Sequence, residues 1–188
     1  MKLKLINNPI RILLSTNALI LIAGSMLGPI YAIFVENIGG DLLDISIISS
    51  GFWLISGITT ILIGRLADEI REGELIIVFG YLLMGVGFIL YTFVDTVFSL
   101  FLVGVLIGFA EAIYSPAFDA LYTRHMQKEK AGNVWGVWEA MNYFTGALGA
   151  LIGGILVSQF GFDVLFWLMS VLCISSALYI YLLPRKVL

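Results

Sequence analysis

One acidic residue, Glu111, stands inside a long apolar run and is the first candidate for chemistry. It lies about 14 residues into the run that begins near Val97, which is about 21 Å along a helix. That depth is past the middle of a hydrocarbon layer about 30 Å thick, where an unpaired charge costs at least about 2.5 kcal/mol. We therefore predict that Glu111 faces a bundle interior and binds a substrate cation or a proton. The alternative is a neutral acid that hydrogen-bonds within the bundle.

A second polar pair, Glu139 and Asn142, lies near the start of a later apolar run and shares about one helix face. With Trp135 and Trp138 nearby, the pair predicts a polar cavity floor. An interfacial tryptophan belt beside a solvated carboxylate is the alternative. Three polar residues of the first apolar run are expected to line the same cavity: Asn17, Ser25 and Tyr31. The candidate substrate- or proton-binding residues are thus Glu111, Glu139, Asn142 and Asn17.

The same residue types argue against an enzyme. Aspartyl catalysis needs two close carboxylates, whereas Glu111 and Asp119 are about 12 Å apart along one helix. The one histidine, His125, falls in a predicted loop, which argues against a serine–histidine dyad, and the one cysteine, Cys173, is alone in an apolar stretch and can form no internal disulfide. No spacing favours a zinc or iron site, and no phosphate-binding glycine loop for ATP is present. We therefore expect no catalytic residue, no metal and no cofactor.

Composition indicates what must position these side chains. The chain has 188 residues, of which 60% are hydrophobic and only 12% charged, and its mean hydropathy is +1.03. Soluble domains carry about 25% charged residues, so lipid must surround much of this chain. The apolar runs are continuous and lack the alternation of a membrane β-barrel. The expected partners are membrane lipid and a small solute, with no nucleic acid.

The apolar runs predict an all-α polytopic membrane protein with a single six-helix domain. The first run is too long for a signal peptide and has no clear cleavage site. The expected helices cover about residues 12–35, 45–64, 75–93, 97–122, 134–157 and 164–183.

The basic residues fix the expected orientation. If six helices alternate, all ten Lys and Arg residues lie on one side, and short loops rich in such residues stay in the cytoplasm. The other turns carry only acidic residues: Glu36, Asp41, Asp44, Asp95 and Asp163. Both termini are therefore expected in the cytoplasm, and the cell membrane is the expected location.

A weak internal repeat divides the chain into units of about 1–94 and 95–188. The segment Ser56–Gly64 aligns with Thr145–Gly153, and Pro29 aligns with Pro116. Because three helices are an odd number, such repeats must be inverted in the membrane, as in known transporters. Chance matching among Gly, Ile and Leu is the alternative. Both prolines are expected to kink their helices.

Three segments together resemble the major facilitator superfamily of transporters. Gly64, Leu66, Ala67 and Asp68 match the family pattern Gly-x-Leu-Ala-Asp between its second and third helices, although Glu69, Arg71 and Glu72 depart from the glycine and basic residues of its second part. The run Thr145-x-x-x-Gly149-Ala150-x-x-Gly153-Gly154 is similar to the helix 5 pattern of proton-driven exporters, with Thr145 and Ala150 in place of a glycine and a proline. In the fourth helix, Val105 occupies the place of the family arginine linked to proton coupling, and Glu111 replaces a small residue.

The resemblance covers the first six-helix half of a twelve-helix family. It implies a secondary transporter working by alternating access, with a cytoplasmic gate built from Gly64, Asp68, Arg71, Asp119 and Arg124. Asp119 is expected in an ion-pair network with Arg65, Arg71 or Arg124. Independently of the family, closely spaced glycines predict tight helix packing at Gly104, Gly108, Gly149, Gly153 and Gly154.

An isolated half has no opposite wall, so we predict that the chain pairs with itself or with a second six-helix half. A non-transporting truncated fragment or a regulatory membrane protein is the alternative.

Overall fold

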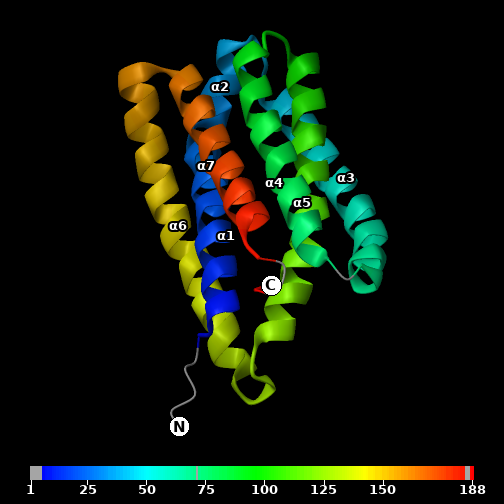
Figure 1. The fold of residues 1–188 in the computed structure, drawn as a ribbon. Coiled ribbons are helices and arrows are strands. Elements are labelled where there is room, and N and C mark those ends of the chain that lie inside the picture. Colours follow the sequence, from blue (N-terminus) through cyan, green and yellow to red (C-terminus); the bar gives the residue numbers. More distant parts are fainter. Residues whose placement is uncertain (1–5, 71, 185–186) are drawn as a thin grey trace.

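The computed structural model describes residues 6–70, 72–184 and 187–188, without the side chains of residues 66–69. The described chain is an upright bundle of helices (Figure 1), and no strand occurs in this part of it. Six of its helical stretches are long and apolar enough to cross a membrane. The predicted all-α fold with six spanning helices is therefore confirmed.

The elements follow one another as α1 (Asn8–Leu27), η1 (Gly28–Ile30), α2 (Tyr31–Asn37), α3 (Leu42–Glu69), α4 (Gly73–Leu90), η2 (Tyr91–Phe93), α5 (Val97–His125), η3 (Lys128–Lys130), α6 (Ala131–Phe160) and α7 (Phe162–Leu182). Local sequence explains several of their ends. Asn7 caps α1 by accepting a hydrogen bond from the Ile10 amide at 3.0 Å, and Thr96 forms a capping box with Ser99 at the start of α5. Gly161, with a φ of 81°, ends α6 in a conformation that suits glycine.

The first spanning stretch is not a continuous helix. Pro29 lies in the 3-10 turn η1, between α1 and α2. Proline has no amide hydrogen and its ring obstructs the preceding helical turn, which accounts for the break. Pro116, in contrast, lies inside the continuous helix α5.

The turns are shorter than the sequence predicted. Residues Gly64–Glu69 belong to the end of α3, so the polar turn to α4 begins only at Ile70. Glu36 belongs to α2 and Asp44 to α3, and Asp41 and Asp44 exchange hydrogen bonds at the α3 start. The expected basic loop 123–133 is mostly helical as well. The helices α3, α5 and α6 have 28 to 30 residues and are therefore about 42–45 Å long. They extend beyond a hydrocarbon core about 30 Å thick.

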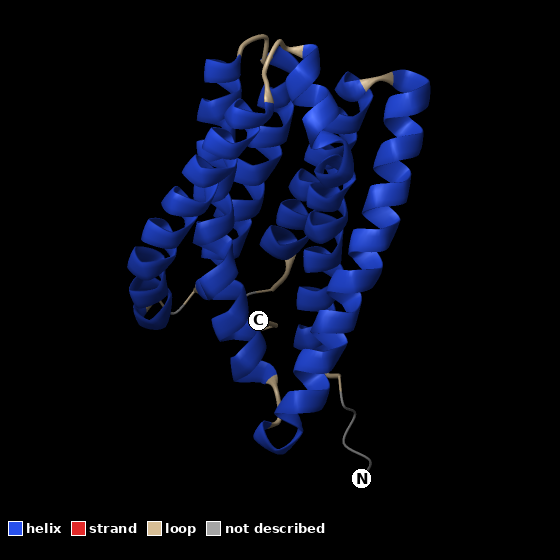
Figure 2. Cartoon of the chain, turned by 180° about the vertical axis from the view of Figure 1, so that it is seen from behind, coloured by secondary structure: helices blue, strands red, loops and turns tan. Residues whose placement is uncertain are grey.

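The helices form two layers. Contacts between neighbouring helices give the order α3, α5, α1 and α6 in one layer. The second layer consists of α4 and α7, which pack on each other. In the contact between the layers, α4 packs on α5 and α7 packs on α1. Figures 1 and 2 show α3 and α6 at opposite edges of the bundle. The helix α1 thus packs mainly on α6 and α7, and α5 packs mainly on α3 and α4. The first helix of each predicted repeat therefore contacts mainly helices of the other predicted repeat.

Glycine positions set the closest helix contacts. A Cβ at Gly149 would lie 2.7 Å from the Ile22 carbonyl oxygen of α1, and one at Gly153 would collide with the Met26 backbone. On the other side, a Cβ at Gly108 would lie 2.8 Å from the Phe52 carbonyl oxygen of α3. Gly154 differs from the prediction: no atom would meet a Cβ there, because it points away from the face of α6 that contacts α1.

The turns sort between the two ends of the bundle. The turns that lead into α3, α5 and α7 lie at one end, and the α3–α4 and α5–α6 connections lie at the other (Figure 1). The first turn of α1 and the last turn of α7 share this second end. The described basic residues lie in elements at or near this end: Arg11, Arg65, Arg124, Lys128 and Lys130.

Candidate functional site

A pocket of about 510 Å³ lies between the first span (α1, η1 and α2), α3, α4 with η2, and α5, and α7 contributes one residue. This volume is in the range of small-molecule sites, about 300–1,000 Å³. We call it the central pocket. It is lined by Ile20, Leu21, Gly24, Ser25, Leu27, Gly28, Tyr31, Phe52, Trp53, Met84, Phe88, Tyr91, Ile107, Glu111, Tyr114 and Met169.

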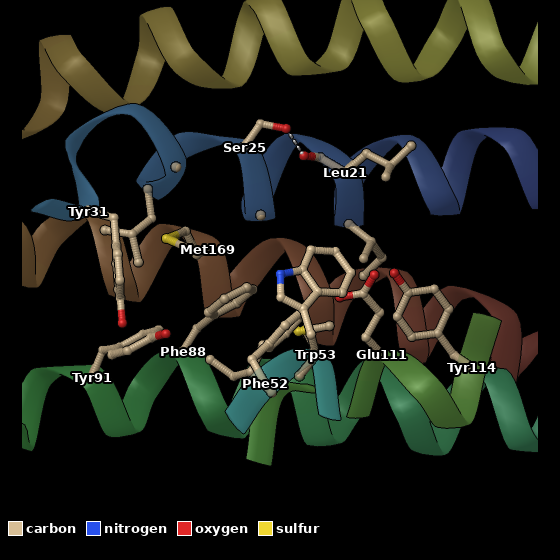
Figure 3. Close-up of a pocket in the computed structure, with 16 residues that line it drawn as sticks. Leu21, Ser25, Tyr31, Phe52, Trp53, Phe88, Tyr91, Glu111, Tyr114 and Met169 are labelled. Carbon is tan, nitrogen blue, oxygen red and sulfur yellow. Dashed lines mark hydrogen bonds between the residues drawn. The ribbon is translucent and has the colours of Figure 1, made fainter. Parts of the chain in front are cut away.

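Glu111 is the only lining residue with a formal charge. It occupies the midpoint of α5 and projects between Trp53 and Tyr114 into the space in front of α1 (Figure 3). No hydrogen bond or ion pair with another described residue holds its carboxyl group. The carboxyl is therefore available to a ligand in the pocket.

Aromatic rings form much of the remaining wall. They come from the broken first span, from α3 and from the α4–η2 and α5 segments: Tyr31, Phe52, Trp53, Phe88, Tyr91 and Tyr114. Phe52 and Trp53 pack edge to face with centroids 5.1 Å apart. Trp53 is 69% exposed, so this side of the pocket is open. The sequence singled out only Tyr31 among these rings, because an aromatic residue in an apolar run can equally face lipid.

Ser25 and Tyr31 line the central pocket as predicted for the first span, but Asn17 does not. Its side chain is buried and joins three helices. The Asn17 amide nitrogen donates to the Tyr81 hydroxyl of α4 at 3.3 Å, and its oxygen accepts from the Trp138 indole nitrogen of α6 at 3.2 Å. The polar group that we assigned to binding therefore satisfies its hydrogen bonds within the protein.

Glu139 and Asn142 are not among the residues that line the pocket either. Glu139 is exposed on α6 beside Tyr143, and Asn142 is half-buried. Trp138 points inward to Asn17. Because consecutive helical residues are about 100° apart, its neighbour Glu139 points outward. The predicted cavity floor is thus not formed by this pair in the present arrangement.

The proposed gate residues lie near the end of the bundle that carries the described basic side chains. Gly64 has open space around its Cα, and Asp119 and Arg124 are exposed. The side chain of Asp68 and all of Arg71 lie outside the described part of the chain. No ion pair between Asp119 and Arg65 or Arg124 is present among the described side chains, which leaves the expected network unsupported there. No group of three or more described His, Cys, Asp or Glu residues is placed to hold a metal ion.

Comparison with known proteins identifies the protein family. The model of the Major Facilitator Superfamily matches residues 13–187. An uncharacterised MFS-type transporter of Methanocaldococcus jannaschii is 28% identical over 156 residues, which is 83% of this chain and 40% of that protein. The multidrug resistance protein MdtG of Salmonella typhimurium is 25% identical over 181 residues, or 93% of this chain and 44% of that protein.

The chain therefore spans less than half the length of these relatives. The matching region nevertheless extends through all six spanning helices, including those that build the central pocket. This integral, multi-pass membrane chain belongs to the Major Facilitator Superfamily.

Proposed function

We propose that this chain is one six-helix unit of a secondary transporter that moves a small solute by alternating access. The observation that carries the proposal is the unpaired carboxyl of Glu111 at the midpoint of a spanning helix, inside a pocket of about 510 Å³. Polar groups at this depth mark solute or ion pathways in membrane proteins. The relatives named as transporters support the same function.

The small solute belongs in the central pocket, and the aromatic wall allows for contacts with varied organic molecules. The name of the Salmonella relative, multidrug resistance protein, agrees with such a pocket. A gate near Gly64, Asp68 and Arg71 would close the cytoplasmic side, with both chain termini in the cytoplasm. This function is transport without catalysis, in the cell membrane.

The exposed layer supports pairing with a second six-helix unit. Only 11% of the α3 span and 17% of the α6 span is buried, against 33% to 50% of the other spans. Large apolar residues are exposed on both helices, for example Leu54 at 67% and Leu148 at 52%. In this family two halves are related by an axis along the membrane normal. Such an axis brings α3 of one unit against α6 of the other, because the two helices lie at opposite edges.

Cross-linking tests the pairing. Leu54 is about 18 Å from the start of α3, and Leu148 is about 18 Å from the end of α6. These two helix ends lie at the same end of the bundle (Figure 1), so the two residues lie at a similar depth. A variant carrying L54C and L148C should give dimers on mild oxidation in liposomes if two copies pair. The native Cys173 is buried and should not contribute.

The matched control is L178C, which is also exposed but lies on the face formed by α4 and α7. It should give few dimers. A protein that transports solute while remaining strictly monomeric in lipid would contradict the pairing.

A further inference from the structure

We propose that the central pocket selects a monovalent organic cation with an aromatic body. This inference rests on the proposed function, and it adds the chemical class of the solute. It starts from the side chains in Figure 3, where one carboxyl group stands among aromatic rings.

The charge of the pocket sets the sign of the ligand. Glu111 is the only formally charged residue among those that line the pocket, and no Lys, Arg or His faces it there. A ligand anion would meet a carboxylate and no compensating cation. A ligand cation would form the ion pair that the described residues do not provide.

The rings decide between an organic cation and a metal ion. The indole of Trp53 lies beside Glu111 in the pocket (Figure 3), with Tyr114 on the other side. Aromatic faces attract a cation within about 6 Å of the ring centre, and tryptophan does so best. Hard metal ions need six or more oxygen ligands, whereas the wall is mostly carbon and holds a single carboxylate.

The number of acids sets the charge. With one carboxylate in the pocket, a monovalent ligand is neutralised, whereas a dication would keep an uncompensated charge at mid-membrane. The remaining volume is bounded by the methionine side chains Met84 and Met169. Such flexible side chains adapt to irregular apolar shapes. The ligand therefore presents one cationic centre and apolar aromatic groups around it.

The test compares two ions of similar size and shape but opposite charge, tetraphenylphosphonium and tetraphenylborate. The full chain in lipid nanodiscs should bind radiolabelled tetraphenylphosphonium saturably, beyond the partition into empty nanodiscs. Tetraphenylborate should show no saturable binding. Equal binding of the two ions, or no saturable binding of tetraphenylphosphonium, would overturn the assignment, and this comparison needs no variant.

Variants identify the groups responsible. Glu111→Gln should weaken tetraphenylphosphonium binding by about tenfold or more, and Glu111→Asp should retain part of the preference for the cation. Trp53→Leu should weaken binding about threefold or more, while Trp53→Phe should lose less, because it keeps an aromatic face. The matched control Glu36→Gln, at the exposed end of α2, should bind as the wild type does. Unchanged binding by folded Glu111→Gln would contradict the proposal.

The binding measurement separates this inference from the proposed function. If the protein binds cations selectively but moves no solute even when it is paired with a second six-helix unit, only the transport role is contradicted. Transport of a solute by a protein that lacks cation-selective binding would contradict only the pocket assignment.

Discussion

Asn17 joins α1 to α4 and α6 through a single amide group. Its two partners, Tyr81 and Trp138, are held at 3.3 Å and 3.2 Å. Hydrogen bonds between helices in membranes contribute about 0.6 kcal/mol on average, and an unsatisfied buried group costs about 1–3 kcal/mol. The side chain is therefore a link between helices whose loss should be measurable.

We predict that Asn17→Leu lowers the free energy of unfolding by about 0.6–2 kcal/mol, since the Trp138 nitrogen loses its acceptor. The rate at which a thiol reagent labels Cys173 on heating reports unfolding, because this residue is the only cysteine and is buried. Ser15→Leu, on an exposed face of α1, is the control. Equal labelling midpoints for both variants would show that the link is dispensable.

Glu111→Gln should abolish or uncouple transport, because an amide can neither carry the charge of a carboxylate nor exchange its proton. Asp68→Asn should only slow transport. Flux through reconstituted protein under a fixed gradient measures both. Wild-type flux from Glu111→Gln would remove Glu111 from the pathway.

Sequence alone predicted the depth of Glu111 because an acid within an apolar run is visible in one dimension. It did not predict which way Glu139 faces. A rotation of about 100° separates it from Trp138, and only the packing of α6 on α1 fixes that rotation. The side-chain partners of Asn17 were likewise hidden, since they lie 64 and 121 residues away in the chain.

At the scale of elements, the contact between α6 and α1 depends on the absence of side chains at Gly149 and Gly153. A methyl group at Gly153 would meet the Met26 backbone, whereas one at the next residue, Gly154, would meet nothing. The glycine spacing in the sequence predicted a tight contact but gave neither the partner helix nor the different role of Gly154.

Gly153→Ala should therefore destabilise the protein by about 1–3 kcal/mol through overpacking, and Gly154→Ala should change stability little. Thermal unfolding in detergent, followed by size-exclusion chromatography of the soluble fraction, distinguishes the two variants. Similar losses in both would show that α6 does not cross α1 at Gly153.

The ends of the helices were the least predictable feature at this scale. Gly64 and the residues up to Glu69 continue α3, although their polarity favoured a turn. A helical turn outside the hydrocarbon has the same polar composition as a loop, so composition does not separate them. The apolar runs themselves were sufficient to predict the six spans.

At the scale of the whole molecule, the arrangement predicts opposite locations for the two kinds of turn. Reporter fusions in the turn between α2 and α3 should be extracytoplasmic, and fusions at Met126–Gln127 should be cytoplasmic, because short basic segments stay inside. Detection of both reporters in one compartment would contradict the six-span topology.

The packing of α1 on α6 and α7, which follow much later in the chain, also constrains how the protein is inserted and folded. The ribosome releases α1 long before α6 and α7, on which it mainly packs. Until residues near 182 have been inserted, α1 must wait in the bilayer with lipid or a chaperone around it, and its buried Asn17 has no Trp138 to contact. A chain that stopped after α4 would therefore leave α1 without its main packing partners, α6 and α7.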